Sequence, residues 1–278
     1  MNASNEVSGT GLLEKPSRSG QRMRLMPDPR VRRLIAPVVI PPSSRGAESL
    51  LHRRTAQIQG FPLFSGISPE DSKQILTPAS HQEFSRREVI YQEGDPINKV
   101  FLLISGSAKI TQVAQNGGEV ILRLSGPGEL VGKMRFESHA RHGSLAQTLG
   151  SSTALVWEAS VFESLCHRFP ALRRNAMYGI SKSLEEMEER FREISTEKVA
   201  VRLSHEILRL LDQVGRRVNG AVQISLSREE LAQLIGTTLF TVSRLLCDWD
   251  ERGIVSIGRE TVSVSDSQGL KQLRETEG

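Results

Sequence analysis

The residues with the most specific recognition chemistry lie toward the carboxyl end of the chain, in the segment LSREELAQLIGTTLFTVSRLL, residues 226–246. Within it, Arg244 offers a guanidinium whose planar fork can donate two hydrogen bonds to O6 and N7 of a guanine. Ser227 and Glu230 have the spacing of a capping box, so a helix is predicted to begin there. Gly236 permits the left-handed backbone of a tight turn, and the apolar spacing after it predicts a second helix. Two helices joined in this way indicate a helix-turn-helix, which places its second helix in the major groove of DNA.

The outward face of that second helix is predicted to contact DNA. The predicted base contacts are Leu239, Phe240, Ser243 and Arg244. The predicted phosphate contacts are hydroxyls at the starts of the two helices, Ser227, Thr237 and Thr238. The ring of Phe240 can rest on the methyl group of a thymine, or it can instead pack inward against the segment that follows.

A short β-hairpin is predicted directly after the two helices. β-Branched residues alternate with small polar residues in 254–257 and again in 261–264, on either side of a turn at Gly258. A hairpin in this place is the wing of a winged helix-turn-helix. The two helices alone would also fit an ordinary helical hairpin in a globular core, and it is the wing that favours DNA binding.

Length and charge limit what the rest of the chain can be. With 278 residues, 38% hydrophobic and 24% charged, the chain can form two folded domains. The net charge of +4 comes from residues 1–60, which hold ten Lys or Arg against four Asp or Glu. Because this tail is rich in Pro, Ser, Gly and Arg, residues 1–48 are predicted to be disordered. The remainder is nearly neutral, so the prediction of DNA binding rests on local geometry rather than on bulk charge.

Neither a membrane span nor a secretory signal is predicted. No window approaches the ~20 apolar residues of a transmembrane helix, and the first residues lack the basic-then-apolar order of a signal peptide, so we expect a cytoplasmic protein without a membrane partner. The two cysteines, Cys166 and Cys247, are far apart and predict neither a disulfide nor a metal site, so packing is their expected role. Cys247 follows Arg244 by three residues, which also allows the hypothesis of a redox switch.

The middle of the chain is predicted to be an antiparallel β-roll. From about Phe61 to Trp157, short apolar runs alternate with Gly, Asp and Pro, as in EVIYQEGD, VFLLISGSAKI and EVILRLSGPGEL. Runs of this length separated by turn residues are typical of strands in an antiparallel barrel or roll.

A long helix is predicted to follow the roll and to pair with a second copy of itself. Its apolar residues alternate in spacing between three and four, as along the seam of a coiled coil. A helix lying on its own core usually has a wider apolar stripe, although that arrangement is the alternative. The predicted dimer seam is Met177, Ile180, Leu184, Met187, Phe191 and Ile194.

These elements give an α+β chain in four parts. They are a disordered basic tail (1–48), a β-roll effector domain (49–174), a dimerisation helix (175–196) and a winged helix-turn-helix (197–278). A two-fold dimer would place two recognition helices about one DNA turn, roughly 34 Å, apart on a near-palindromic site.

This order of parts resembles the Crp/Fnr family of bacterial transcription regulators. The resemblance runs from about Phe61 to Leu270 and rests on PLFSGIS, VIYQEGD, LLISGSAKI and PGELVG in the roll, and on LAQLIGTTLFTVSRLL in the DNA-reading part. It implies a jelly roll of the cyclic-nucleotide-binding type that senses a small molecule. It also implies a homodimer that binds double-stranded DNA and contacts RNA polymerase.

The effector cassette departs from the cyclic-AMP pattern that the resemblance implies. Lys133 stands where that pattern has a ribose-binding Glu, and a cation cannot accept hydroxyl hydrogen bonds. His142, Gly143 and Ser144 replace the phosphate-binding Arg-Ser pair, with Arg141 displaced, so an ordinary cyclic-AMP response is not expected. The effector stays open: another anion, a haem held through His139 or His142 (either of which is more often a solvated surface residue), or none. The candidate pocket residues are Gly128, Glu129, Leu130, Lys133, Arg141, His142 and Ser144.

Two further expectations follow from the same resemblance. No cysteine precedes Cys166, so the iron-sulfur cluster of Fnr-type members is not expected. In the predicted DNA-reading helix, Arg244 and Ser243 match the family pattern. Phe240, however, occupies the place of a Glu that accepts a hydrogen bond from cytosine. We therefore expect a half-site that keeps the guanine and prefers a nearby thymine.

Catalysis is not predicted, because neither GxSxG nor HExxH occurs and no carboxylate pair suggests acid–base chemistry. The alternative from another class is a ligand-binding signalling module whose terminal helices contact protein rather than DNA.

Overall fold

The structure is a computed structural model that describes residues 55–114, 117–132, 140–218 and 220–277. All of them belong to one compact unit, Ser43–Gly278. The predicted disordered tail, residues 1–48, lies outside the described residues, as do Lys133 and His139. In the part of the chain that is described, no helix is both long enough and apolar enough to cross a membrane.

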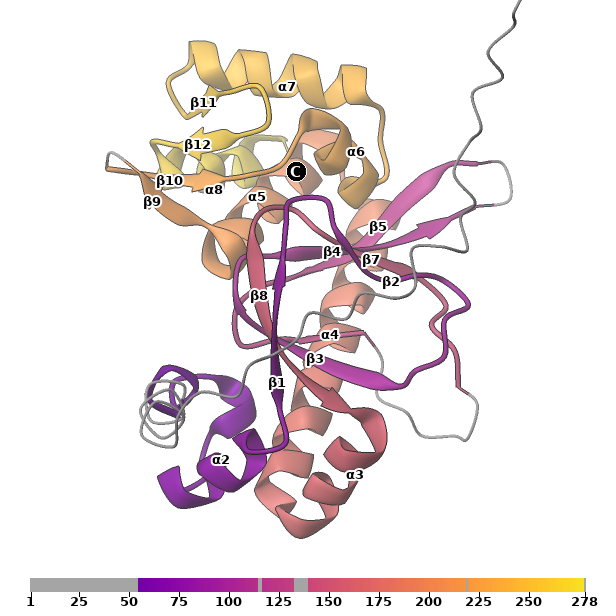
Figure 1. Ribbon diagram of the computed structural model, residues 1–278. Coiled ribbons are helices and arrows are strands. Elements are labelled where there is room, and N and C mark those ends of the chain that lie inside the picture. Colours follow the sequence, from indigo (N-terminus) through magenta and orange to yellow (C-terminus); the bar gives the residue numbers. More distant parts are fainter. Residues whose placement is uncertain (1–54, 115–116, 133–139, 219, 278) are drawn as a thin grey trace, which may run out of the picture. The chain divides into compact units, whose positions relative to one another are not determined.

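Two four-stranded antiparallel sheets form the predicted β-roll (Figure 1). One sheet has the strand order β1-β8-β3-β6 and the other β2-β7-β4-β5. The strands are β1 (Ser80–Phe84), β2 (Val89–Tyr91), β3 (Lys99–Ser105), β4 (Ala108–Val113), β5 (Glu119–Ser125), β6 (Leu130–Val131), β7 (Leu145–Thr148) and β8 (Ser152–Glu158).

The central strand β3 shows why the roll needs helices beside it. Its sequence KVFLLIS is buried at five successive positions, because both of its faces are covered. Phe101 and Leu103 join the core between the two sheets. Leu102 and its neighbours on the other face join a second core that is closed by helices. These helices are η2 (Pro62–Phe64), α2 (Pro69–Leu76), α3 (Ala159–Arg168) and the start of α4 (Pro170–Thr196).

Helix α4 is the long helix predicted from the seam pattern (Figure 1). It begins at Pro170, five residues before the predicted boundary at 175, because proline is well tolerated in the first turn of a helix. It ends at Thr196, as expected. Its side toward the roll buries Leu172 and Ala176, and further along it buries Arg190 and Glu193.

The predicted seam residues of α4 are exposed, and three of them, Ile180, Leu184 and Met187, also line a cavity against the roll. Their exposed fractions are 45% for Met177, 39% for Ile180, 56% for Leu184, 42% for Met187, 75% for Phe191 and 44% for Ile194. The alternative, in which this stripe lies on the chain's own core, is therefore excluded. Six large apolar side chains along α4 are thus each at least 39% exposed.

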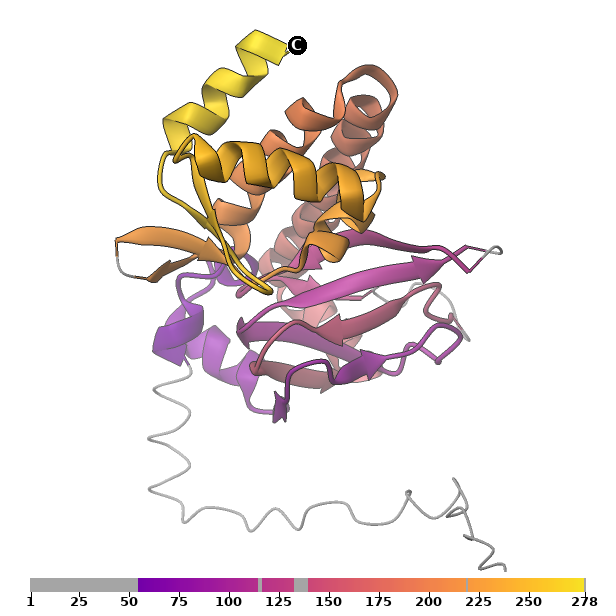
Figure 2. The ribbon, with the colours of Figure 1, turned by 90° about the horizontal axis from the view of Figure 1, so that it is seen from above.

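The carboxyl-terminal module combines helices with a four-stranded sheet of order β11-β12-β10-β9. Its helices pack on a core that includes Val242, Leu246 and Trp249, and Figure 2 shows helix α7 crossing the outside of the module. The elements are α5 (Val199–Val214), β9 (Arg216–Val218), β10 (Ala221–Ile224), α6 (Arg228–Ile235), α7 (Leu239–Glu251), β11 (Val255–Ile257), β12 (Val262–Val264) and α8 (Ser267–Glu277).

Local signals in this module act as the sequence predicts. Ser227 and Glu230 form the capping box, with Glu230 N donating to Ser227 Oγ at 3.1 Å and Ser227 N donating to Glu230 Oε2 at 2.9 Å. Gly236 has φ 65° at the turn between α6 and α7, a conformation that side chains disfavour. The hairpin β11–β12 is the predicted wing. The hairpin β9–β10 was not predicted, because RRV in β9 is exposed at all three positions and lacks an apolar face.

The roll and the carboxyl-terminal module contact each other through both apolar and charged groups. Ile121 and Leu124 of β5 are part of the module's core. Lys109 Nζ lies 3.3 Å from Glu230 Oε1. Glu260, beside the wing, pairs with Arg86 and, at 2.8 Å, with Arg87.

The two cysteines differ in environment. Cys166 is buried, and this burial raises the pKa of its thiol to about 11, so it is a packing residue as expected. Cys247 is exposed, and the expectation that it packs is wrong. It lies on the side of α7 away from the buried positions Val242 and Leu246.

Candidate nucleic-acid interface and ligand pocket

Helix α7 presents the predicted base-reading residues on its open face. The helix is anchored from below by Val242, Leu246 and Trp249, each of which is fully buried. Phe240 is 84% exposed, so the alternative that its ring packs against the wing is excluded. Leu239 and Arg244 are also exposed, and Ser243 is half-buried. Among the described residues, none forms a hydrogen bond or ion pair with Arg244.

Two of the three predicted phosphate-contacting hydroxyls, those of Ser227 and Thr238, already have structural tasks. Thr238 is the N-cap of α7, and its side chain accepts a hydrogen bond from Thr241 N at 3.3 Å. Ser227 Oγ lies 3.0 Å from Glu230 Oε2 and is half-buried. Thr237 is half-buried at the turn. Of these three, Thr238 is the exposed one, at the amino-terminal end of α7, where backbone N–H groups favour phosphate.

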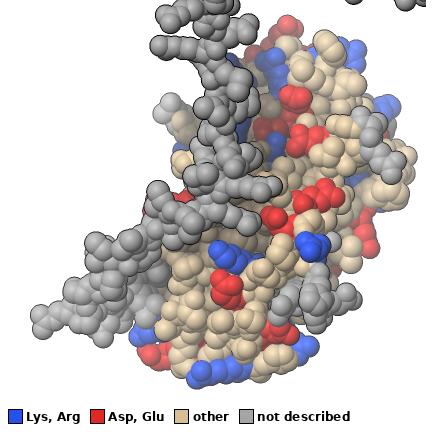
Figure 3. Space-filling model, turned by 45° about the vertical axis from the view of Figure 1, so that its right-hand side comes forward, with Lys and Arg blue, Asp and Glu red and all other residues tan. Residues whose placement is uncertain are grey.

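Surface charge alone does not mark a DNA-binding face. On the side of the molecule shown in Figure 3, Lys and Arg are interspersed with Asp and Glu among neutral residues. This agrees with the nearly neutral composition after residue 60. This face therefore shows no large positive patch, and the candidate interface is identified from the geometry of α7.

The residues of the predicted effector cassette separate into two environments. Arg141 is exposed, and its Nη1 donates to the Gly94 carbonyl at 2.6 Å. His142 is 4% exposed, and its ring stacks on Tyr91 with centroids 3.6 Å apart and planes at 13°. The expectation that His142 is a solvated surface residue is therefore wrong, because the loop folds it into the roll. Ser144 is buried beside Tyr91, whose pKa is raised by burial and lowered in part by a hydrogen bond with Ser144.

A cavity of about 680 Å³ lies between the roll and α4. Gly128, Glu129 and Leu130 line it as predicted for the candidate pocket, whereas Arg141, His142 and Ser144 do not. Arg123 was not predicted as a pocket residue from the sequence. The signal available for it is that its charge interrupts the apolar pattern of β5. The contribution of α4 was not predicted either, and it comes from Asn175, Ala176, Tyr178, Gly179, Ile180, Lys182, Ser183, Leu184, Glu186 and Met187.

Arg123 and Glu129 are two of the four charged side chains that line this cavity, with Lys182 and Glu186. Arg123 Nη1 donates to Ser125 Oγ at 3.0 Å and Nη2 donates to the Leu130 carbonyl at 3.2 Å. Glu129 Oε2 accepts from Gly126 N at 3.1 Å, and Gln213 Nε2 on α5 donates to both carboxylate oxygens, at 3.2 and 3.1 Å. Gly126 is required here, because a Cβ at this position would lie 2.6 Å from the Gln213 carbonyl oxygen. The pocket carboxylate is thus bonded directly to the first helix of the DNA-reading module.

The pH dependence of stability should reveal the buried charge of Glu129. Burial raises its pKa above the ordinary 4.5, although hydrogen bonds from Gly126 and Gln213 partly oppose this. A raised pKa means that the folded state binds the proton more tightly, so this contribution is present below the ordinary pKa and is lost as pH rises through the folded pKa. We expect Glu129→Gln to raise the midpoint temperature of thermal unfolding at about pH 8, by about 2–4 °C for each kcal/mol gained in the free energy of unfolding. Near pH 4 the variant and the wild type should have the same midpoint. A midpoint difference between variant and wild type that does not depend on pH would contradict this account.

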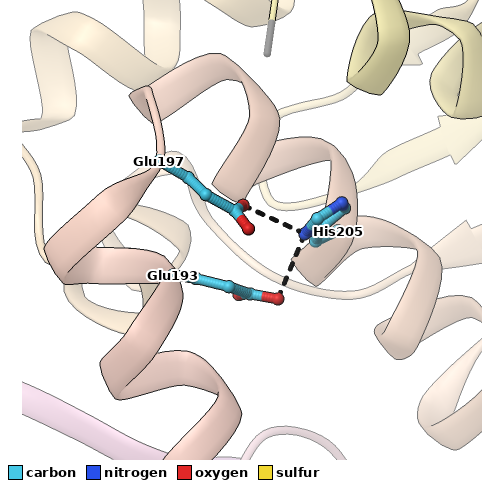
Figure 4. Close-up of side chains that lie close together, drawn as sticks. All are labelled: Glu193, Glu197 and His205. Carbon is cyan, nitrogen blue, oxygen red and sulfur yellow. Dashed lines mark hydrogen bonds and ion pairs between the residues drawn. The ribbon is translucent and has the colours of Figure 1, made fainter.

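A group of titratable side chains lies where α4 meets α5 (Figure 4). One ligand atom from each of Glu193, Glu197 and His205 lies within 4.8 Å of the others, a spacing that could hold a cation. However, Arg209 Nη1 and Nη2 already donate to the two oxygens of Glu193, at 2.7 and 2.8 Å. Burial would raise the pKa of Glu193, but the hydrogen bonds and charge of Arg209 and His205 hold it below its ordinary value. The geometry therefore describes a neutralised ionic cluster rather than a metal site.

An antiparallel roll with a pocket against a long helix, followed by a winged helix-turn-helix, defines a transcription regulator that combines an effector domain and a DNA-binding domain. Comparisons with known families agree: a model for the cyclic nucleotide-binding domain matches residues 81–169, and one for the Crp-like helix-turn-helix domain matches residues 201–273. The chain belongs to the Crp/Fnr family of bacterial transcription regulators.

Three similar proteins are matched over nearly their whole length by this chain. A CRP-like cAMP-activated global transcriptional regulator of Mycobacterium tuberculosis is 25% identical over 75% of this chain and 94% of that protein. The cyclic AMP receptor protein of Thermus thermophilus is 28% identical over 78% of this chain and 98% of that protein. The structure of FixK2 from Bradyrhizobium japonicum covers 70% of this chain and 96% of its own, with 21% identity and a TM-score of 0.63, which supports the fold. These relatives are regulators rather than enzymes, and the alternative of a protein-binding signalling module is not favoured.

Proposed function

We propose that the chain acts as a homodimer on a near-palindromic operator, and that its roll responds to a ligand other than cyclic AMP. Each subunit would read one half-site with α7, through Arg244 on guanine and Phe240 on a thymine methyl group. In line with the family, this regulator would work in the cytoplasm together with RNA polymerase and would catalyse no reaction. The observation that carries the proposal is the open face of α7, where Phe240 is 84% exposed beside an exposed Arg244.

Exposure of the α4 seam supports the dimer. Six large apolar side chains, each at least 39% exposed, lie along one face of a helix of 27 residues. A monomer would leave this stripe in water, whereas pairing with a second copy buries it with the a/d spacing of a coiled coil. Two-fold pairing also presents two copies of α7, which a near-palindromic site requires.

The lining of the pocket supports an effector other than cyclic AMP. Arg123 is the guanidinium at the cavity, since Arg141 is bound to the Gly94 carbonyl instead. Most of the other lining residues are apolar, among them Leu130, Leu184 and Met187. This favours a ligand with an apolar body and an anionic group that Arg123 or Lys182 can meet. Neither haem nor an iron-sulfur cluster is part of the proposal.

Selection of bound sequences from a random DNA pool tests the proposal and the role of Phe240 together. Wild-type protein should enrich an inverted repeat that contains guanine and an adjacent thymine in each half. Phe240→Glu should keep the guanine and exchange the thymine for cytosine, because a carboxylate accepts from cytosine N4 and a phenyl ring does not. We expect the preference at that position to change by about 1–3 kcal/mol.

Two results of this selection would count against the proposal in different ways. Identical motifs for both proteins would show that Phe240 does not read a base. No enriched motif for the wild type, together with DNA binding that does not weaken with salt, would reject operator recognition as a whole, since phosphate contacts must release counterions.

A further inference from the structure

The junction between α4 and α5 contains a buried ionic network that joins these two helices and bonds a backbone carbonyl of β5. Helix α4 ends at Thr196 and α5 begins at Val199, so the direction of the chain changes within a few residues. We name the ionisable side chains packed at this bend the elbow cluster, and they are Arg190, Glu193, Glu197, Arg202, His205, Glu206 and Arg209.

Arg190 joins the roll, the dimer helix and the DNA-reading module. It lies on α4 between the seam residues Met187 and Phe191. Its Nη1 donates to the Leu122 carbonyl of β5 at 3.0 Å, and its Nη2 donates to Glu206 Oε1 of α5 at 3.0 Å. The side chains of Arg190 and Glu206 are 10% and 0% exposed. Leu122 precedes Arg123, which lines the pocket.

Arg209 provides a second bridge between the same two helices. Two of its nitrogens bond both oxygens of Glu193 on α4, at 2.7 and 2.8 Å. Its Nε and Nη2 also bond Glu206 Oε2 on its own helix, at 3.0 and 2.8 Å. Because a guanidinium fork and a carboxylate match in only a few planar arrangements, these bonds restrict the angle as well as the distance between the helices.

Arg202 and His205 of α5 complete the cluster. Arg202 Nη1 donates to the Ile194 carbonyl at 3.0 Å, at the end of α4. His205 Nδ1 lies 3.1 Å from Glu193 Oε1 and 3.3 Å from Glu197 Oε2 (Figure 4). Every carboxylate of the bend thus contacts side chains of α5, so α5 cannot rotate on α4 without breaking several bonds.

A buried ionic network of this kind is not needed for stability alone. Ion pairs that are taken out of water lose hydration, and well-packed apolar residues of similar volume often stabilise as much or more. What a buried pair adds is a defined geometry. At this bend the geometry determines how α5, and with it α6 and α7, is directed relative to the dimer seam.

We propose that Arg190 is a positioning residue that fixes the direction of the reading helix relative to the dimer helix, and so sets the half-site spacing that the dimer accepts. The inference rests on the proposed function, since it needs a dimer that reads two half-sites. Each added base pair moves a half-site by about 3.4 Å and turns it by about a tenth of a turn. A dimer therefore discriminates against the changed spacing only if the angle between α4 and α5 is rigid.

The test measures the affinity of full-length protein for a series of operators in which the spacer is one or two base pairs shorter or longer than the selected one. We expect wild type to lose about tenfold or more in affinity for each changed base pair. Arg190→Met should flatten this profile to about threefold or less, because the bonds of Arg190 to the Leu122 carbonyl of β5 and to Glu206 of α5 are lost and the Arg209–Glu193 bridge alone must then hold α5 against α4. Arg173→Met is the matched control, since Arg173 lies on the same helix, is exposed and is outside the elbow cluster.

Spacer preference separates positioning from a general loss of structure. A purely structural role would lower the affinity for all spacers by the same factor and leave the profile unchanged. If Arg190→Met does not fold, the pair Arg190→Met with Glu206→Met removes both charges and keeps the bend packed, and it should give the same flat profile. A wild-type-like profile in the folded variants overturns the inference. A wild type that selects no operator would instead reject the proposed function.

Discussion

Arg244→Ala should abolish sequence-specific operator binding while leaving the fold and the dimer intact. Each guanidinium that bonds O6 and N7 of guanine contributes about 1–3 kcal/mol of discrimination, and a dimer carries two. The combined loss of roughly 2–6 kcal/mol corresponds to about 30-fold to 10⁴-fold in affinity. The fold should be unaffected, because Arg244 is exposed and no described residue is bonded to it.

Fluorescence anisotropy with the selected operator and with a scrambled duplex would measure this loss. The affinity for the scrambled duplex should change little, and so should the dependence of that affinity on salt. Salt dependence comes from contacts to phosphates, which release counterions, whereas Arg244 is expected to contact a base. Arg252→Ala is the matched control: it removes the same charge at the opposite end of α7, where Arg252 pairs with Asp248 at 3.2 Å. Retention of operator preference by Arg244→Ala, or an equal loss in both variants, would contradict guanine reading by Arg244.

Leu184→Glu should convert the dimer to a folded monomer and remove most of the operator affinity. Leu184 lies near the middle of the seam and also lines the cavity, but it is 56% exposed in the single chain, so glutamate there costs the folded monomer little. In a two-fold pair, two carboxylates would be buried near each other without partners, which costs several kcal/mol. Loss of the second half-site then removes the gain from bivalent binding, about 10²–10⁴-fold.

Sedimentation at micromolar concentration and circular dichroism would separate association from folding in this experiment. Glu189→Lys is a stringent control, because it changes the charge by more than Leu184→Glu does, on a side chain of α4 that is 54% exposed and outside the seam. That control should remain a dimer and bind the operator as the wild type does. A Leu184→Glu protein that sediments as a dimer would show that the seam is not where the copies meet.

The two experiments address different surfaces, and their combination is informative. The Arg244 variant should remain a dimer without operator preference. The Leu184 variant should keep an intact reading helix without a partner. A mixture of wild type with an excess of the Arg244 variant should then form heterodimers and reduce operator binding in proportion to their fraction.

The DNA-reading part could be predicted in detail from the amino-acid sequence. The capping box joins residues three apart, the turn depends on one glycine, and the wing on two alternating runs, so each signal is complete within a short window. The seam of α4 was predictable for the same reason, because helical periodicity shows in the spacing of apolar residues. Only the structure, however, shows that the seam is uncovered and that Phe240 points outward.

The pocket and the elbow cluster were decided by the tertiary structure. Arg190 and the Leu122 carbonyl are 68 residues apart, and Gln213 and Glu129 are 84 apart, so no local pattern brings them together. His142 has the sequence surroundings of a loop, yet it is buried because the roll folds that loop over Tyr91. Sequence periodicity specifies which face of an element is apolar. Which faces meet, and which polar groups are buried with them, depends on the packing of whole elements across long separations.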